Sequence, residues 1–86
     1  MELEALKATV KEYILREFLP GERPDALTDS TPLITGGILD SIATLKLVGF
    51  LEETFHVSLE AHEVDADHLD TVEMIAELVT SKNSQG

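Results

Sequence analysis

The chain contains no cysteine and no tryptophan, and aromatic residues make up only 5% of it. Without cysteine it forms no disulfide, builds no cysteine-based zinc site and has no thiolate nucleophile. Any thioester chemistry would therefore need a thiol that is added to the chain. The scarcity of aromatic residues, beside 43% hydrophobic residues overall, favours a small helical bundle with an aliphatic core over an aromatic-rich β-sandwich.

Basic residues are also few, with 6 Lys and Arg against 17 Asp and Glu, and the formal net charge is -11. Such a surface repels nucleic acid, because nucleic-acid binding needs clustered basic side chains, and it disfavours anionic membranes. It attracts partners that carry basic patches, over a distance that salt shortens. The other interpretation is that the acidity only keeps the protein soluble.

Long hydrophobic runs are absent as well, and no apolar stretch approaches the length that a membrane span needs. The first residues, Met1-Glu2-Leu3-Glu4, lack the basic and apolar regions of a secretory signal peptide. We therefore expect a soluble protein of the cytoplasm.

The 86 residues suffice for one domain. Apolar residues recur at spacings of three and four in three segments, whereas no strand-like alternation stands out. Pro and Gly gather between the first two segments and predict a long loop, of a kind that is usually functional. We predict an all-α four-helix bundle over residues 1–81, followed by a polar tail over 82–86. Its elements are a helix over 2–18, a loop over 20–39, a helix over 41–55, a short helical turn near 61–67 and a helix over 71–81.

The second predicted helix is expected to be the most buried, because its apolar residues form a broad face. Glu52 and Glu53 lie near its C-terminal end, where negative charge opposes the helix macrodipole by about 0.3–1 kcal/mol each. Local stability does not explain them, so we predict that they contact a partner. The predicted apolar face holds Ile42, Leu45, Leu47, Val48, Phe50, Leu51 and Phe55.

Ser41 lies where the loop gives way to this helix, in the run Gly36-Gly37-Ile38-Leu39-Asp40-Ser41-Ile42. Asp and Ser are both favoured N-caps, each worth about 1 kcal/mol over Ala, so capping alone is one interpretation of the serine. The other is covalent modification, because a helix N-terminus stabilises a phosphate and the two glycines permit a sharp turn that exposes the hydroxyl. Asp40 would repel a phosphate. A role in recognition, or in holding a metal ion for a modifying enzyme, explains the presence of Asp40 better.

Leu39-Asp40-Ser41-Ile42 resembles the Asp-Ser-Leu/Ile attachment motif of the acyl carrier protein superfamily. The likeness extends over most of the chain, through the first helix, the long loop, the segment ILDSIATLKLVGFLEETFHVSL and the closing DTVEMIAELV. It implies a four-helix carrier domain that performs no catalysis, with phosphopantetheine from coenzyme A attached to Ser41. The thiol of that arm would hold an acyl or aminoacyl group as a thioester, as in fatty acid, polyketide or nonribosomal peptide biosynthesis.

The resemblance also implies partners for a monomeric carrier. A phosphopantetheinyl transferase would install the arm with Mg²⁺, and Asp40 and Ile42 match the flanking positions that such enzymes read. Ligases that load the cargo, and synthases that use it, would dock through basic patches. Glu52 and Glu53 match the family's acidic pair and complete, with Lys46, the predicted partner-recognition residues.

The second helix departs from the pattern of carriers in primary fatty acid synthesis. Ala43 and Lys46 stand where acidic residues are typical, and Gly49 stands where a larger apolar residue is common. A glycine inside a helix costs about 1 kcal/mol, so close packing or the approach of a partner would explain it. These departures favour a stand-alone carrier for a specialised pathway, and they leave acyl and aminoacyl cargo both open.

Two other classes of function compete with the carrier. In the first, Ser41 would form a hydrolase triad with a histidine and an aspartate, but the Gly-x-Ser-x-Gly elbow of such enzymes is missing. In the second, the chain is an unmodified acidic interaction module that docks on a basic partner and uses Ser41 only as a cap. The histidines available to a triad are His56, His62 and His68.

Two patterns suggest metal sites only in part. His62-Glu63 begins like a zinc-protease helix, but the second histidine is missing. Asp65, Asp67 and Asp70 echo a calcium loop that lacks the required Gly and the closing Glu. We predict that these residues form a solvated acidic surface with no specific metal site, which leaves loose binding of divalent cations open.

Overall fold

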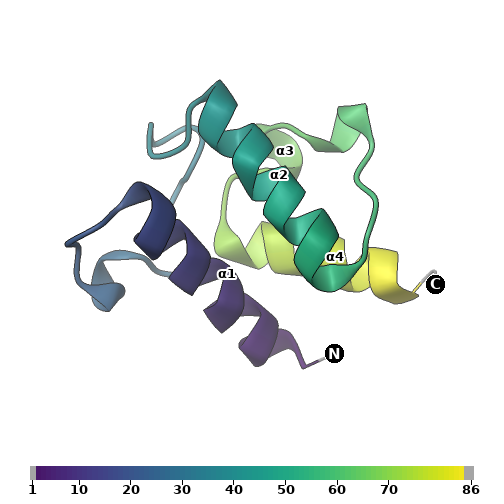
Figure 1. Ribbon diagram of the computed structural model, residues 1–86, viewed down its shortest axis with the longest axis horizontal. Helices are drawn as coiled ribbons and strands as arrows, with labels where there is room; N and C mark the ends of the chain where they lie inside the picture. The colour runs from purple at the N-terminus through teal and green to yellow at the C-terminus, as the bar shows by residue number, and fades with distance from the viewer. Residues whose placement is uncertain (1, 85–86) are drawn as a thin grey trace.

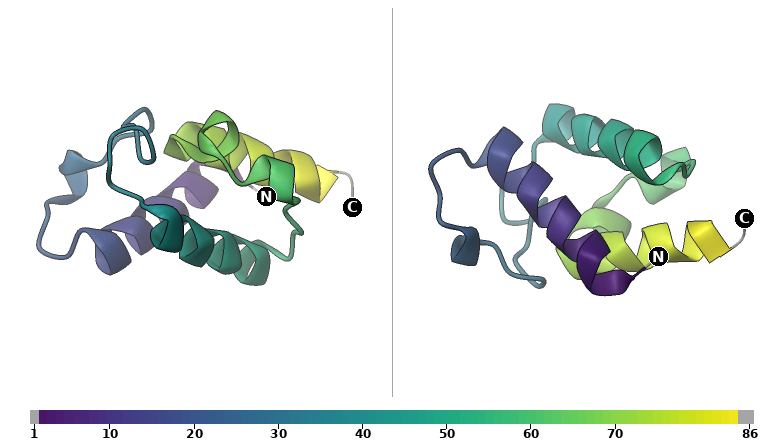
Figure 2. Two further views of the ribbon diagram at one scale, coloured as in Figure 1. Left: turned by 90° about the horizontal axis from the view of Figure 1, so that it is seen from above. Right: turned by 60° about the horizontal axis from the view of Figure 1, so that its bottom comes forward.

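The computed structural model describes residues 2–84, which are helical or irregular throughout and include no strand. The chain ends of this part lie toward one end of the molecule, and the long loop between the first two helices lies at the other (Figures 1 and 2). The prediction of an all-α bundle with three main helices, one short helix and a long first loop is confirmed. The elements are α1 (Leu3–Phe18), η1 (Pro24–Ala26), α2 (Ser41–Phe55), η2 (Ala61–Glu63), α3 (Ala66–Leu69) and α4 (Val72–Ser84).

Helix α1 buries one stripe of side chains, Leu6, Val10 and Ile14, whose spacing of four places them on one face. Its N-cap is Glu2, whose carboxylate accepts hydrogen bonds from the N–H groups of Glu4 and Ala5. The helix ends just before the Pro20-Gly21 pair, as predicted. α1 packs against α4, which also contacts α2 and α3, so α4 is the element around which the bundle is assembled.

The prediction for α2 is wrong on one side of the helix. Ile42 and Leu45 were placed on the buried face, but their side chains are 66% and 64% exposed. The residues that α2 buries lie on its other side, and α4 packs against α2. α4 is the more completely buried helix, since its core residues have no exposed surface. The buried residues of α2 are Ala43, Thr44, Leu47, Leu51 and Phe55, and those of α4 are Val72, Ile75, Ala76 and Val79.

The end of α4 also differs from the prediction. The helix continues to Ser84 rather than 81, so the first part of the predicted tail is helical. Lys82 explains the extension, because its Nζ lies 2.7 Å from Oε1 of Glu63 and ties the last turn to η2. The rest of the predicted tail, residues 85–86, lies outside the described residues, and the domain boundary stays a prediction.

The long first loop packs onto the bundle through apolar side chains. Leu27, Leu33 and Leu39 are buried, and Asp29 fixes the middle of the loop to α1. Its carboxylate lies 2.6 Å from Nζ of Lys11 and 3.1 Å from Nζ of Lys7. The hydrogen bonds from Lys11 and Lys7 hold the pKa of Asp29 below its usual value.

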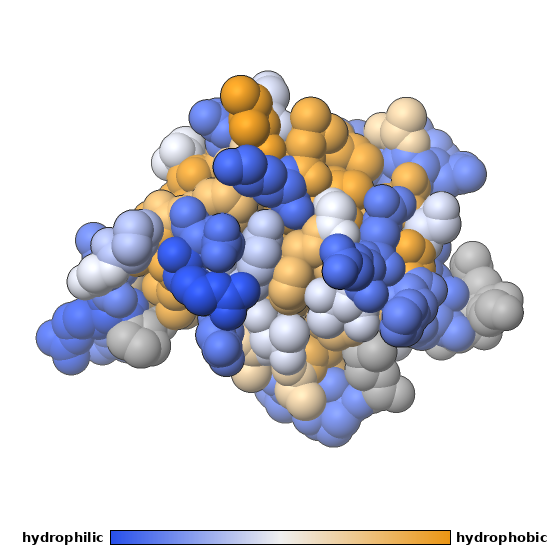
Figure 3. Space-filling view, viewed as in Figure 1, coloured by the Kyte–Doolittle hydropathy of each residue, from blue (hydrophilic) through white to orange (hydrophobic). Residues whose placement is uncertain are grey.

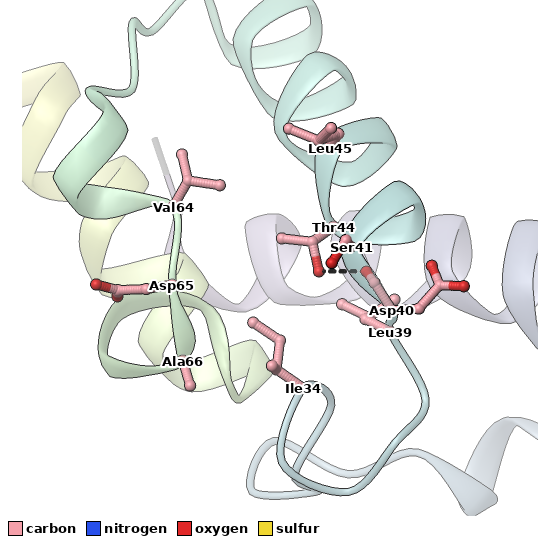
Figure 4. A pocket seen from close by; sticks show the side chains of 9 residues that line it. All are labelled: Ile34, Leu39, Asp40, Ser41, Thr44, Leu45, Val64, Asp65 and Ala66. Atoms are coloured by element: carbon pink, nitrogen blue, oxygen red, sulfur yellow. Dashed lines mark hydrogen bonds between the residues drawn. The ribbon is translucent and has the colours of Figure 1, made fainter.

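The predicted helical turn near 61–67 is present in two pieces, η2 and the four-residue α3. They are separated by Val64 and Asp65, whose backbone lies across a groove from the start of α2 (Figure 4). Among the described helices, none combines the length and apolar character needed to cross a membrane.

Candidate functional site

Ser41 is the first residue of α2, and its neighbour Asp40 takes the role of N-cap. Oδ1 of Asp40 accepts a hydrogen bond from the N–H of Ala43 at 2.8 Å. Its carbonyl oxygen accepts from the N–H of Thr44 at 2.9 Å and from its Oγ1 at 2.8 Å. Of the two predicted cap candidates, Asp40 is the cap, and capping does not explain Ser41.

The Ser41 side chain is exposed, and across residues 2–84 its hydroxyl makes no hydrogen bond. It lies at the N-terminal end of a 15-residue helix, where the unpaired N–H groups of the first turn carry partial positive charge. The hydroxyl is therefore free to react and lies where a phosphate ester is stabilised.

The two glycines before Ser41 meet different requirements of the loop. A Cβ on Gly36 would collide with the carbonyl oxygen of Pro32, and Gly37 has a φ of +83°, which side-chain-bearing residues rarely adopt. The turn that they permit brings the N–H of Leu39 to the carbonyl oxygen of Leu33 at 2.8 Å. The loop thus folds back on itself immediately before the serine, as the glycine pair predicts.

Asp70, at the junction of α3 and α4, holds this folded loop in place. Its Oδ1 accepts hydrogen bonds from the N–H groups of Ile34 and Thr35, both at 2.9 Å. Its Oδ2 accepts from Oγ1 of Thr35 at 2.8 Å. The N–H of Thr35 contributes most to holding the pKa of Asp70 below its usual value. The prediction that Asp70 is part of a solvated acidic surface is wrong, because it is a loop anchor.

A groove of about 520 Å³ lies beside Ser41, between the start of α2 and the segment that joins η2 to α3 (Figure 4). Ile34 forms part of its floor, and Val64 and Leu45 face each other across it. The carboxylates of Asp40 and Asp65 point away from it, so its interior is mainly apolar. The residues that line the groove are Ile34, Leu39, Asp40, Ser41, Thr44, Leu45, Val64, Asp65 and Ala66.

The wall of the groove opposite α2 is fixed by acidic side chains with polar partners. Besides pairing with Lys82, Oε1 of Glu63 accepts a hydrogen bond from the N–H of Glu60 at 2.9 Å. The bond from Lys82 is the main reason that the pKa of Glu63 lies below its usual value. Oδ1 of Asp65 lies 2.8 Å from Nδ1 of His68, and this contact lowers the pKa of Asp65. This wall is therefore held by contacts within the fold.

The other predicted recognition residues are spread along α2 and do not meet at the groove. Ile42, Lys46 and Glu53 are exposed. Glu52 has a role within the fold, because its Oε2 accepts a hydrogen bond from the N–H of Leu59 at 2.9 Å. That bond holds the chain after α2, so Glu52 has an explanation that needs no partner.

The residues of the two partial metal motifs do not form a metal site in the described part of the chain. Within residues 2–84, no group of three His, Asp or Glu side chains is arranged to hold a metal ion. Asp65 is engaged with His68 and Asp70 with the loop, so two of the three calcium-loop aspartates are committed to other contacts. No hydrogen bond links Ser41 to a histidine in this part of the chain, and the contact that defines a triad is missing.

No family model matches this sequence. The chain is 35% identical over 74 residues to the probable acyl carrier protein PigG of Serratia sp. (strain ATCC 39006). The aligned part covers 86% of this chain and 84% of that protein. This identity extends over most of both chains. The helical bundle and the exposed serine at the start of α2 are consistent with the same family. The chain is a carrier protein, and it belongs to the acyl carrier protein family.

Proposed function

We propose that Ser41 is the attachment site of phosphopantetheine and that the chain delivers acyl or aminoacyl groups on this arm to partner enzymes. The protein itself would catalyse no reaction. The observation that carries the proposal is the division of roles at the start of α2. Asp40 caps the helix, and the hydroxyl of Ser41 is exposed and has no hydrogen bond across residues 2–84.

The surroundings of Ser41 suit the arm chemically. Its phosphodiester would lie at the positive end of the α2 dipole. Asp40, which precedes Ser41, is hydrogen-bonded to the N–H of Ala43, and its carboxylate points away from the groove. When attached, the arm supplies the terminal thiol that the cysteine-free chain lacks.

Attachment is a substitution at phosphorus. The Ser41 oxygen forms a bond to the phosphorus atom that bears pantetheine, and the phosphoanhydride bond of coenzyme A breaks. Adenosine 3′,5′-bisphosphate leaves, and the serine proton passes to a base of the transferase. The chain contributes an accessible hydroxyl on a rigid helix end, which a transferase can approach without first breaking a hydrogen bond.

The groove beside Ser41 is where part of the arm or a small cargo would rest. Its volume of about 520 Å³ is in the range of sites that hold small molecules, and its interior is mainly apolar. An acyl chain, or an aminoacyl group with an apolar side chain, would suit this interior. Attachment to one carrier raises the effective concentration of the cargo at each partner enzyme, which a free thioester would not achieve.

Intact-mass spectrometry tests the attachment. The purified protein is incubated with coenzyme A, Mg²⁺ and a broad-specificity phosphopantetheinyl transferase, beside Ser41→Ala as the matched control. We expect the wild type to gain the mass of one phosphopantetheine and the variant to gain none. Because Asp40 is the N-cap, Ser41→Ala should retain its helical circular dichroism. A variant that gains no mass then shows loss of the attachment site and not loss of the fold.

An unmodified wild type would favour the alternative, an acidic interaction module without a prosthetic group. Modification of Ser41→Ala would move the attachment point to another hydroxyl. The remaining proposals follow from the carrier role: a monomer in the cytoplasm, modified by a transferase, loaded by a ligase and used by synthases. Size-exclusion chromatography tests the first of these.

A further inference from the structure

The last turn of α4 is tied to the segment that leads into one wall of the groove. Nζ of Lys82 lies 2.7 Å from Oε1 of Glu63, and the two side chains are only 20% and 12% exposed. Because both charges are largely shielded from water, they attract each other more strongly than the charges of a fully exposed ion pair do. This contact connects the C-terminal end of the described chain to η2.

The backbone of residues 60–64 bonds mainly within its own segment. The N–H groups of Glu60, Glu63 and Val64 donate to Oε1 of Glu63 and to the carbonyl oxygens of Glu60 and Ala61, at 2.9, 2.9 and 3.2 Å. The 3-10 helix η2, which lies in the connection between α2 and α3 (Figure 1), buries none of its three residues. Apolar burial therefore contributes little to holding η2, and its position depends on the ion pair with Lys82.

Val64 carries the position of η2 into the groove. It follows Glu63 directly, is half-buried, and its side chain faces Leu45 of α2 across the groove (Figure 4). The N-terminal part of α2 forms the other wall, and Figure 3 shows hydrophobic surface over it. A shift of Glu63 would therefore move Val64 and change the spacing between two apolar walls.

We propose that Lys82 is a positioning residue for the phosphopantetheine arm, because through Glu63 it holds Val64 in contact with the arm in the groove. This inference rests on the proposed function and adds to it a residue from the opposite end of the domain. The two methyl groups of the arm lie next to its phosphate, so they are the apolar group of the arm that meets Val64 and Leu45. Loss of the charge at position 82 would release η2 and this contact, and would leave Ser41 unchanged.

Hydrogen exchange in the unmodified protein tests whether Lys82 holds η2. The N–H groups of Glu60, Glu63 and Val64 are followed by NMR in wild type, Lys82→Met and Lys82→Arg. We expect exchange to be about tenfold faster in Lys82→Met, because a hydrogen bond between charged groups is lost. Lys82→Arg keeps the charge and should exchange at nearly the wild-type rate. The N–H of Ile75, near the start of α4, should be unaffected in both variants, which shows that the fold is retained.

Lys11→Met is the matched control. It makes the same substitution at an ion pair of similar length, because Nζ of Lys11 lies 2.6 Å from Oδ1 of Asp29 on another part of the bundle. We expect it to leave exchange over residues 60–64 at the wild-type rate. Faster exchange in Lys82→Met then reports the contact with Glu63, and not the loss of one positive charge from a protein of net charge -11.

Nuclear Overhauser effects in the protein that carries phosphopantetheine test the contact with the arm. We expect effects between the methyl groups of the arm and those of Val64 in wild type and Lys82→Arg, and their loss in Lys82→Met. The mass gained on incubation with coenzyme A and the transferase should be the same in all three proteins. A contact that only stabilised the fold would leave the effects between the arm and Val64 unchanged.

Wild-type exchange over residues 60–64 in Lys82→Met would overturn the proposal. It would also be overturned by a modified wild type whose arm methyl groups make no contact with Val64, or by equal contacts in wild type and Lys82→Met. Failure of the proposed function looks different, because the wild type would then gain no phosphopantetheine while the exchange measurement on the unmodified protein would still give its result.

Discussion

Helices α1 and α2 differ in the residues that lie outside the core. On α1, the basic residues Lys7, Lys11 and Arg16 all have carboxylate partners. On α2, two large apolar side chains, a glycine and a lysine that has no ion pair within residues 2–84 face solvent. Helix positions outside the core are more stable with good helix formers and paired charges, and the basic residues of α1 follow that rule while this side of α2 does not. The difference shows that stability within the fold does not account for the exposed side of α2, the helix that begins with Ser41.

The test with the largest expected effect compares two leucines of α2. Leu47 has no exposed surface, whereas Leu45 is 64% exposed. We expect Leu47→Ala to lower the free energy of unfolding by about 2–5 kcal/mol, because it leaves a cavity in the core. Leu45→Ala should change it by less than about 0.5 kcal/mol. Urea denaturation of both variants measures this, and a similar loss in each would mean that the outward side of α2 contributes to the core.

The second test concerns the loop between the two helices. Asp70→Ala removes three hydrogen bonds to Ile34 and Thr35 that are partly open to solvent. We expect a loss of about 1–2 kcal/mol in the free energy of unfolding. Asp70→Asn should recover part of it, because its amide oxygen can still accept from the two N–H groups. Denaturant unfolding measures both values, and equal stability of the Ala variant and wild type would exclude Asp70 as the anchor.

The third test exchanges glycine and alanine between the two helices. Gly49→Ala should raise the free energy of unfolding by about 0.5–1 kcal/mol, since the new Cβ meets no atom. Ala8→Gly, at an exposed position of α1, should lower it by a similar amount. Thermal unfolding of the two variants gives both signs. A destabilised Gly49→Ala would show that the glycine has a role within the fold and not on its surface.

The smallest effect is expected in the pH dependence of stability. The pKa of Asp29 is lowered by Lys11 and Lys7, so this carboxylate stabilises the fold at pH values above its unfolded pKa of about 4. That contribution is lost as the pH falls through the lowered, folded pKa. Asp29→Asn should therefore be less stable than wild type at neutral pH, and the two should converge in acid. Urea midpoints across this range measure the difference, and parallel curves would contradict the pairing of Asp29 with α1.

The sequence predicted the helices well because each has a periodic apolar stripe and a clear stop signal. Pro20-Gly21 after α1 and Asp40 before α2 are local signals, and both mark the observed ends. The extension of α4 was missed because it depends on Lys82 reaching Glu63, a contact between distant positions. The prediction of Ile42 and Leu45 in the core is wrong because the apolar pattern of a helix does not distinguish an exposed apolar residue from a packed one.

The candidate site was predictable in part for the same reason. Ser41 and its neighbours form one continuous motif, and the glycines that shape the loop precede it directly. The anchor on Asp70 was missed because 36 residues separate it from Ile34, and no local pattern links them. The groove joins residues from three separate parts of the chain, so only the folded chain defines it.

The cap on Asp40 also makes position 41 available for protein engineering. A residue that stabilises neither the helix end nor the core can be replaced by one that is chosen only for its reactivity. Since the chain has no cysteine, Ser41→Cys would create its sole thiol, at the helix end beside the groove. Maleimide or haloacetyl reagents would then label one defined atom, and synthetic arms of chosen length could be installed without coenzyme A or a transferase.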